Sequence, residues 1–389
     1  MRHTRILTRA TGAQNSPFCA ALTPAQAQQA RAFHRSFPQY APTPLVALPA
    51  LGARLGLGGL FIKDESPRFG LNAFKVLGGS YAIGRHIAAR LGARPEEMTH
   101  AALTGADARE ALGDAVFFTA TDGNHGRGVA WTARELGCRA VVRMPKGTVK
   151  SRVENIRALG AEVTVEERNY DGCVRLAAQQ AAQTPGGVLV QDTAWPGYEQ
   201  IPLYIMQGYL TMALEADEQM DAPPTHVFLQ AGVGSMAAAV AAYFEQAHPQ
   251  DPPKIILVEP TAADCFFRSA AKGEITAVKG DMPTMMAGLA CGEPSPIAWD
   301  ILKGLTAAYL SCEDAAAARG MRALARPLAG DRAIVSGESG AATMGALLDA
   351  AADEKAREAL GLDERARVLL ISTEGDTDPV NYRRVMEEG

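Results

Sequence analysis

Apolar and polar residues alternate along most of this chain in a pattern typical of a parallel β-sheet covered by helices. Short runs of β-branched and aromatic residues are separated by alanine-rich stretches with helical spacing. This alternation favours an α/β fold, because crossover helices connect neighbouring parallel strands. Two series of strands are present, so we predict two doubly wound, mostly parallel sheets.

The first series has predicted strands at 115–122, 139–145, 162–167 and 188–193, with helices near 125–137, 150–159 and 171–183. The second series has predicted strands at 225–232, 254–260, 333–339 and 367–375. Two further strands, at 43–51 and 60–66, flank a glycine-rich turn at 52–59, and we expect them to join the second sheet. The pattern predicts a small α/β domain, residues 81–189, inserted into a large domain made of residues 1–80 and 190–389.

Composition narrows the class of protein. The chain has 389 residues, of which 47% are hydrophobic and 21% charged, and its net charge of −5 makes nucleic acid an unexpected partner. The longest stretch of low polarity, 231–244, is too short to span a bilayer, so no membrane segment is expected. The six cysteines form no CxxC pair, and no metal site is predicted. Without a signal-peptide apolar core, a cytoplasmic protein is expected.

The strongest glycine motif is "LQAGVGSMAAAV", residues 229–240, where a buried strand is followed directly by a predicted helix. Backbone N–H groups at such a helix start converge on an anion, and glycine lets the main chain approach it closely. Gly232, Val233, Gly234 and Ser235 would therefore suit one phosphate group. The alternative is a tight turn that needs glycine only for its conformation.

Lys75 lies among small and apolar residues in "RFGLNAFKVLGGSYA". Apolar surroundings destabilise an ammonium group, so we expect a lowered pKa and a nucleophilic amine that forms imines. The alternative is a lysine whose stem is buried and whose charged end reaches water. Pyridoxal 5'-phosphate is a cofactor that needs both an imine-forming lysine and a cradle for one phosphate.

A third motif, "TATDGNHGRGVAW", ends a predicted strand and begins a helix. The Asn124 amide could bond a ring hydroxyl, and backbone N–H groups of the same turn could hold a substrate carboxylate. We expect Asp122 or Asn124 to cap the helix as well.

Taken in order, "NAFKVLGGS", "DGNHGRG", "AGVGS", "SGESGA" and "STEGDTD" resemble the fold type II pyridoxal-phosphate enzymes. More narrowly, "KDESPRFGLNAFKVLGGSYA", "TDGNHGRGVAW", "QDTAWPGYEQIP", "MAGLACGEPS" and "STEGDTDP" resemble the diaminopropionate ammonia-lyase family over roughly residues 30–385. The resemblance implies a small amino-acid substrate, a homodimer, and β-elimination of 2,3-diaminopropionate to pyruvate and two ammonia.

The resemblance also implies roles for single residues. Lys75 would form the Schiff base with the cofactor, Asn124 would bind its phenolic oxygen, and the turn from Gly232 to Ser235 would hold its phosphate. Ser372 or Thr373 would face the pyridine nitrogen, and both remain possible. A neutral hydroxyl in that position suits elimination better than transamination.

Asp122 distinguishes this chain from the dehydratases of the same fold, which usually have a small residue before the GNH motif. We hypothesise that Lys75 removes the Cα proton of the L isomer and Asp122 that of the D isomer. Asp192, at the end of a predicted strand, is a candidate for holding the β-amine or relaying a proton, and a turn cap is an equal alternative. Gly123 and His125 complete the expected substrate site, although a structural role for His125 is favoured.

Three alternatives stay open. A serine or threonine dehydratase of the same fold is opposed by Asp122 and by "STEGDTD" in place of a glycine-rich ending. A synthase that replaces the β-substituent passes through the same chemistry. A non-catalytic binding protein is opposed by the presence of Lys75. Glu338 could approach the cofactor ring or cap a helix starting at Gly340, and Cys265 and Cys291 are expected as free thiols on a segment that covers the substrate.

Overall fold

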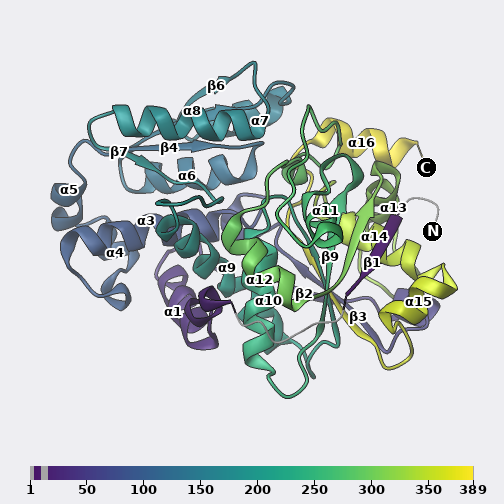
Figure 1. Ribbon diagram of the computed structural model, residues 1–389. Helices are drawn as coiled ribbons and strands as arrows, with labels where there is room; N and C mark the ends of the chain where they lie inside the picture. Colours follow the sequence, from purple (N-terminus) through teal and green to yellow (C-terminus); the bar gives the residue numbers. More distant parts are fainter. Residues whose placement is uncertain (1–3, 10–15, 389) are drawn as a thin grey trace.

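The computed structural model describes residues 4–9 and 16–388. Two sheets with helices on their faces make up the fold (Figure 1). The larger sheet has the strand order β1-β10-β9-β8-β11-β3-β2. Its strands are β1 (Thr4–Thr8), β2 (Leu45–Ala47), β3 (Gly59–Asp64), β8 (His226–Gln230), β9 (Lys254–Pro260), β10 (Thr306–Cys312) and β11 (Arg367–Ser372). The two edge strands, β1 and β2, are antiparallel to their neighbours, and the other pairs are parallel.

The smaller sheet is entirely parallel, with the order β6-β5-β4-β7. Its strands are β4 (Val116–Ala120), β5 (Arg139–Met144), β6 (Glu162–Val165) and β7 (Gly187–Leu189). In Figure 1 this sheet lies at the upper left, with α8 above it and α6 below it. The expected fold class, two mostly parallel α/β sheets, is confirmed.

Helices connect the strands and cover both sheets. They are α1 (Pro24–Arg35), α2 (Pro49–Arg54), α3 (Val76–Leu91), α4 (His100–Leu103), α5 (Ala106–Leu112), α6 (Asn124–Glu135), α7 (Lys150–Arg157), α8 (Tyr170–Gln183), α9 (Gln200–Gln219), α10 (Ser235–Ala247), α11 (Cys265–Lys272), α12 (Pro296–Leu305), α13 (Asp314–Ala325), α14 (Ala342–Ala351), α15 (Glu354–Leu360) and α16 (Pro379–Glu387). Within the described ranges, none of them has the length and hydropathy that a bilayer crossing requires.

The two halves of the apolar core on either side of the large sheet follow from the alternation of side chains along each strand. On β11, Leu369 and Ile371 pack with the apolar residues of α9 and α10, whereas Val368 and Leu370 pack with those of α13 and α14. Successive side chains of a strand point to opposite faces, so a strand covered on both faces is apolar throughout. Helices therefore cover the large sheet on both sides, and only the strand ends are free to carry polar chemistry.

Two predicted strands were wrong, and β10 was not predicted. Residues 333–339 form a loop and no strand, because "SGES" interrupts the apolar run and its side chains bond to the end of β11 and to α16. Strand β10 joins the large sheet instead, and it was missed because it follows α12 with no turn residue between them. The predicted strand at 43–51 stops at Ala47, since Pro49 occupies the first turn of α2, where proline is favoured.

The strands of the small sheet fall within residues 81–189, and those of the large sheet fall within 1–80 and 190–389. The division into two domains stays a prediction. Its boundary at residue 80 lies inside α3, however, and domain boundaries usually lie in exposed loops.

Helix α3 packs closely against α9. A Cβ atom on Gly208 would lie 2.3 Å from the carbonyl oxygen of Leu77, so only glycine permits this approach. The contact fixes the start of α3, and Lys75 immediately precedes that helix.

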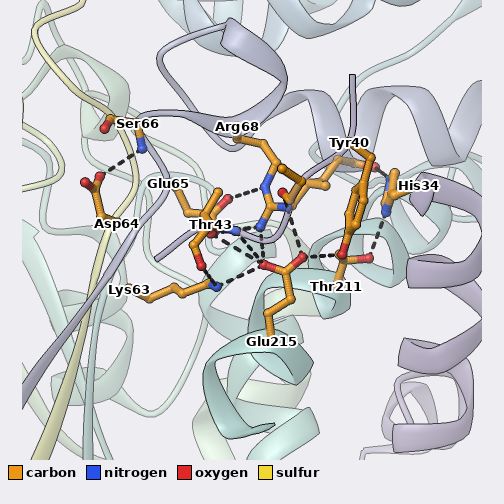
Figure 2. A network of polar contacts seen from close by, with 12 residues as sticks. His34, Tyr40, Thr43, Lys63, Asp64, Glu65, Ser66, Arg68, Thr211 and Glu215 are labelled. Atoms are coloured by element: carbon orange, nitrogen blue, oxygen red, sulfur yellow. Dashed lines mark hydrogen bonds and ion pairs between the residues drawn. The ribbon is translucent and has the colours of Figure 1, made fainter. Parts of the chain in front are cut away.

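A buried network of charges fixes the segment between β3 and α3 (Figure 2). Arg68 Nη2 lies 2.7 Å from Glu215 Oε2, and Arg68 Nε lies 2.8 Å from Glu65 Oε2. Lys63 Nζ lies 2.9 Å from the same oxygen of Glu215, and Thr43 bonds Glu65. Two cations balance two anions away from water, which is the arrangement that buried charges require. The network joins the loop before Lys75 to α9.

Candidate active site

One buried cavity lies where the carboxyl ends of strands from both sheets meet. The predicted residues that line it are Lys75, Asp122, Asn124, His125, Asp192, Gly232, Val233, Gly234, Ser235 and Thr373. Gly123 and Ser372 are not among its lining residues. Open α/β sheets place ligands at this end of their strands, so the location agrees with the general rule.

Lys75 points into the cavity and pairs with Asp192. Its Nζ atom lies 2.5 Å from Asp192 Oδ2, and the rings of Phe74 and Tyr209 lie 5.6 and 6.0 Å from Nζ. Burial alone would lower the pKa of Lys75, but the attraction of Asp192 outweighs it and raises that pKa. The expectation of a lowered pKa was therefore wrong for the protein without cofactor, because the sequence did not show a carboxylate next to the amine.

Asp192 lies just beyond β7 and is almost fully buried. Besides Lys75, its carboxylate accepts hydrogen bonds from the Tyr170 hydroxyl at 3.0 Å and the Gln191 amide at 3.2 Å. Burial would raise the pKa of Asp192, but the charge of Lys75 outweighs this effect and lowers it. The side chain is thus bound to Lys75, Tyr170 and Gln191 and caps no turn.

The turn from Gly232 to Ser235 connects β8 directly to α10, as the motif predicted. Gly234 has a φ of +90°, and a Cβ atom there would lie 2.3 Å from the Phe266 ring. The backbone N–H groups of the turn lie at the start of α10, a helix of 13 residues, and border the cavity. This donor set fits a single phosphate group. Ser235 ties the turn to Asp192 by donating to its carbonyl oxygen at 2.5 Å.

The turn at the start of α6 is held by a residue that sequence reasoning missed. The Thr121 hydroxyl accepts the N–H groups of Gly123 at 2.9 Å and Gly126 at 3.0 Å, so the predicted cap by Asp122 or Asn124 was wrong. Both polar side chains are therefore free for other contacts. The Asn124 amide nitrogen donates to Glu374 Oε2 at 2.5 Å.

His125 has the structural contact that was favoured for it. Its Nε2 atom lies 2.8 Å from the Val190 carbonyl oxygen, which joins α6 to the end of β7. Burial lowers the pKa of His125, so the neutral ring is favoured.

Asp122 lies at the junction of the cavity and a larger open groove. The groove has a volume of about 820 Å³ and runs between the β5–α7 loop, the 281–290 segment and the start of α16. Asp122 Oδ2 lies 3.8 Å from Arg152 Nη1. Burial raises the pKa of Asp122, and the charge of Arg152 acts against this shift. The carboxylate can meet a ligand that enters from the groove.

The two candidate hydroxyls at the end of β11 have different surroundings. Ser372 bonds Ser336 at 2.8 Å, outside the cavity lining. Thr373 lines the cavity, and its oxygen accepts the Gln230 amide at 2.8 Å. Because that bond uses a lone pair of Thr373, its own hydrogen stays available for an acceptor in the cavity.

Several cavity residues were not predicted. They are Tyr170, Gln230, Ser339 and Glu374, with Gly288, Leu289 and Cys291 from the segment expected to cover the substrate. Glu374 could have been found, since it follows a strand within the quoted "STEGDTD" motif; Tyr170 has no such signal. Glu338 bonds Asn381, lies 3.9 Å from Arg152 and is absent from the cavity lining, and α14 begins at Ala342 and not at Gly340. Cys265 and Cys291 are both free thiols.

Comparison with known proteins agrees with this geometry. Residues 37–374 match the family described as pyridoxal-phosphate dependent enzymes. A diaminopropionate ammonia-lyase of Salmonella typhimurium is 52% identical over 368 residues, covering 92% of this chain and 91% of that protein. The structure of the holo diaminopropionate ammonia lyase from Escherichia coli has a TM-score of 0.92 at 46% identity, covering 99% of this chain and 97% of that one.

A second structure of the Escherichia coli enzyme, in complex with D-serine, has a TM-score of 0.92 at 45% identity, with the same coverage. Similarity of this extent spans both sheets and all the motifs that meet at the cavity. The chain belongs to the pyridoxal-phosphate dependent enzymes and, within them, to the diaminopropionate ammonia-lyase family.

Proposed function

We propose that this protein cleaves 2,3-diaminopropionate by β-elimination, consuming one water and releasing pyruvate and two ammonia. The observation that carries the proposal is the meeting, in one cavity, of an amine, a phosphate-binding turn and two carboxylates, Asp122 and Asp192. Family membership supports the substrate, and pyridoxal 5'-phosphate is the cofactor of the family. When bound, this cofactor accepts the electrons that remain at the substrate Cα after proton removal.

Each cofactor contact has a residue to make it. Lys75 Nζ would attach the cofactor, the N–H groups from Gly232 to Ser235 would bind its phosphate, and Asn124 Nδ2 would donate to its phenolic oxygen. Thr373 is the better candidate for the pyridine nitrogen, because Gln230 leaves its hydroxyl hydrogen free. Ser372 is turned toward Ser336 and is not proposed for this contact.

Proton transfer is assigned to three side chains. Lys75 Nζ takes the Cα proton of the L isomer and Asp122 that of the D isomer. Burial raises the pKa of Asp122, which makes this carboxylate a stronger base. Asp192, held by Tyr170, accepts a hydrogen bond from the β-ammonium of the substrate and returns protons to Lys75. The Escherichia coli relative has been solved with D-serine, which supports a site open to D amino acids.

The substrate carboxylate would bind the N–H groups at the start of α6. Thr121 accepts those of Gly123 and Gly126, but not those of Asn124 and His125. The proposed substrate site therefore consists of Asp122 and the N–H groups of Asn124 and His125, with Gly123 contributing only its backbone shape.

The experiment is an absorbance spectrum of the purified protein, followed by assays of pyruvate and ammonia with L- and then D-2,3-diaminopropionate. We expect a visible cofactor band that is lost in Lys75→Ala, and two ammonia for each pyruvate. Turnover of serine or threonine at a higher rate than diaminopropionate would show that the protein is a dehydratase. If a thiol is supplied and a substituted amino acid forms in place of pyruvate, the protein is a β-replacement synthase.

The protein is further proposed to act as a cytoplasmic homodimer, which the family resemblance supports. Light scattering should give twice the mass of the chain, and a monomer that retains full activity would contradict the dimer.

A further inference from the structure

Glu374 is a buried carboxylate at the active site that the proposed reaction does not use. It follows β11, is 1% exposed and lines the cavity. Its Oε2 atom accepts the Asn124 amide at 2.5 Å and the Thr377 hydroxyl at 3.0 Å, and its Oε1 atom accepts the Ser339 N–H at 3.1 Å. Among the described residues, no lysine or arginine forms an ion pair with it within 4.0 Å. The Glu374 carboxylate is therefore held by hydrogen bonds from neutral donors.

The bond to Asn124 determines which way that amide faces. An ionised carboxylate only accepts hydrogen bonds, so the NH₂ group and not the oxygen of Asn124 must face Glu374. An amide nitrogen carries two hydrogens. One is used by Glu374, and the second is left for an acceptor such as the phenolic oxygen of the cofactor. The negative charge of Glu374 would then be separated from that oxygen by the Asn124 amide.

The main chain of the same residue is tied to the segment that contains Lys75. Glu374 forms an antiparallel bridge with Ala73, and the Phe74 N–H donates to the Thr373 carbonyl at 3.1 Å. The Gly337 N–H donates to the Glu374 carbonyl at 3.0 Å. Asn124 begins α6, which follows β4 of the small sheet, and Lys75 lies between β3 of the large sheet and the start of α3. Glu374 contacts both sides and fixes their relative position.

We propose that Glu374 is a positioning residue that orients Asn124 toward the phenolic oxygen of the cofactor and, through its charge, keeps the proton on the linkage between cofactor and Lys75. The inference rests on the proposed function only for the roles of Lys75 and Asn124. A nearby negative charge favours the protonated form of a cationic group, so loss of the charge lowers the pH at which that proton leaves. Asp192, Asp122 and the Tyr209 hydroxyl also face Lys75, and all three are kept in every variant, so a shift against wild type reports the charge of Glu374.

Two variants separate orientation from charge. Glu374→Gln removes the charge and keeps one oxygen that can accept the Asn124 amide, while its new NH₂ group replaces the oxygen that accepts the Ser339 N–H. Glu374→Ala removes the charge and both acceptors. Asp349→Asn is the control, because Asp349 is a largely buried carboxylate that bonds Thr4 and Arg319 and does not line the cavity. The measurement is the visible absorbance of the holoenzyme against pH, without substrate, together with the dissociation constant of pyridoxal 5'-phosphate.

Glu374→Gln should lower the midpoint of the spectral titration by about one pH unit or more while binding the cofactor within a few-fold of wild type. Glu374→Ala should show the same shift and bind the cofactor at least about tenfold more weakly, since an unoriented donor contributes little. Wild-type midpoints in Glu374→Gln would overturn the proposal, even if Glu374→Ala failed to fold. A visible band that survives in Lys75→Ala would instead overturn the proposed function.

Discussion

The Nζ atom of Lys75 lies 2.5 Å from Oδ2 of Asp192, and the two residues are 117 positions apart in the chain. The pKa of Lys75 is raised and the pKa of Asp192 is lowered, because each charge stabilises the other and outweighs the cost of burial. The ion pair therefore favours the charged ammonium form of Lys75. Attachment of the cofactor needs the neutral amine, so Asp192 must slow this step.

Replacing Asp192 with asparagine should speed cofactor attachment while impairing catalysis. Asp192 raises the pKa of Lys75, so its removal lowers that pKa and increases the fraction of neutral amine at a given pH. Each unit of pKa is a tenfold change in this fraction, so attachment at neutral pH should be about tenfold faster or more. Stopped-flow absorbance of apo-protein mixed with pyridoxal 5'-phosphate measures the rate. An unchanged dependence on pH would show that Asp192 does not control the amine.

Replacing Asp122 with asparagine should separate the two isomers. Loss of a general base costs about a hundredfold or more, so kcat/KM for the D isomer should fall by that factor. The L isomer, served by Lys75, should lose less than about tenfold. Asp281→Asn is the control, since Asp281 lines only the open groove and is 70% exposed. Equal losses for both isomers would contradict the assignment of Asp122 as a base.

Replacing Gly234 with alanine should abolish cofactor binding. The new Cβ would meet Phe266 at 2.3 Å, at a φ of +90°, so the turn must shift and its N–H groups no longer converge. Gly273→Ala is the matched control, because Gly273 has a φ of +82° but nothing within 4 Å of an added Cβ. Equilibrium dialysis should show loss of binding in the first variant and wild-type binding in the second, which carries only a strain of about 1 kcal/mol. Equal binding by both variants would mean that the turn does not hold the phosphate.

Replacing Arg68 with methionine should destabilise the whole protein. The substitution leaves Glu65 and Glu215 buried with Lys63 as their remaining cation, and breaking a buried pair costs about 3–5 kcal/mol. Denaturant unfolding measures this change. Arg94→Met is the control, because Arg94 also pairs with a glutamate three positions away but is 71% exposed, and its loss should leave stability unchanged. Similar midpoints for both variants would show that the buried network does not stabilise the fold.

Much of the fold could be predicted from local sequence. The strands β4, β5, β8, β9 and β11 lie where apolar runs predicted them, because a strand covered on both faces must be apolar throughout. The predicted strand at 333–339 and the missed β10 show where this signal fails. No turn residue separates β10 from α12, and residues 333–339 have an apolar start but find no neighbouring strand, because strand pairing depends on the sheet that a segment joins.

The sequence by itself determined which residue types the site contains. Lys75, Asn124 and the glycines at 232 and 234 stand in motifs whose local order carries their chemistry, and a helix start or a glycine turn is built from consecutive residues. The tertiary structure decided what those residues touch. The pairing of Lys75 with Asp192, and of Asn124 with Glu374, joins positions 117 and 250 residues apart. The contact with Asp192 reverses the pKa shift of Lys75 that apolar neighbours predict, because an electrostatic interaction depends on distance in space and not on separation along the chain.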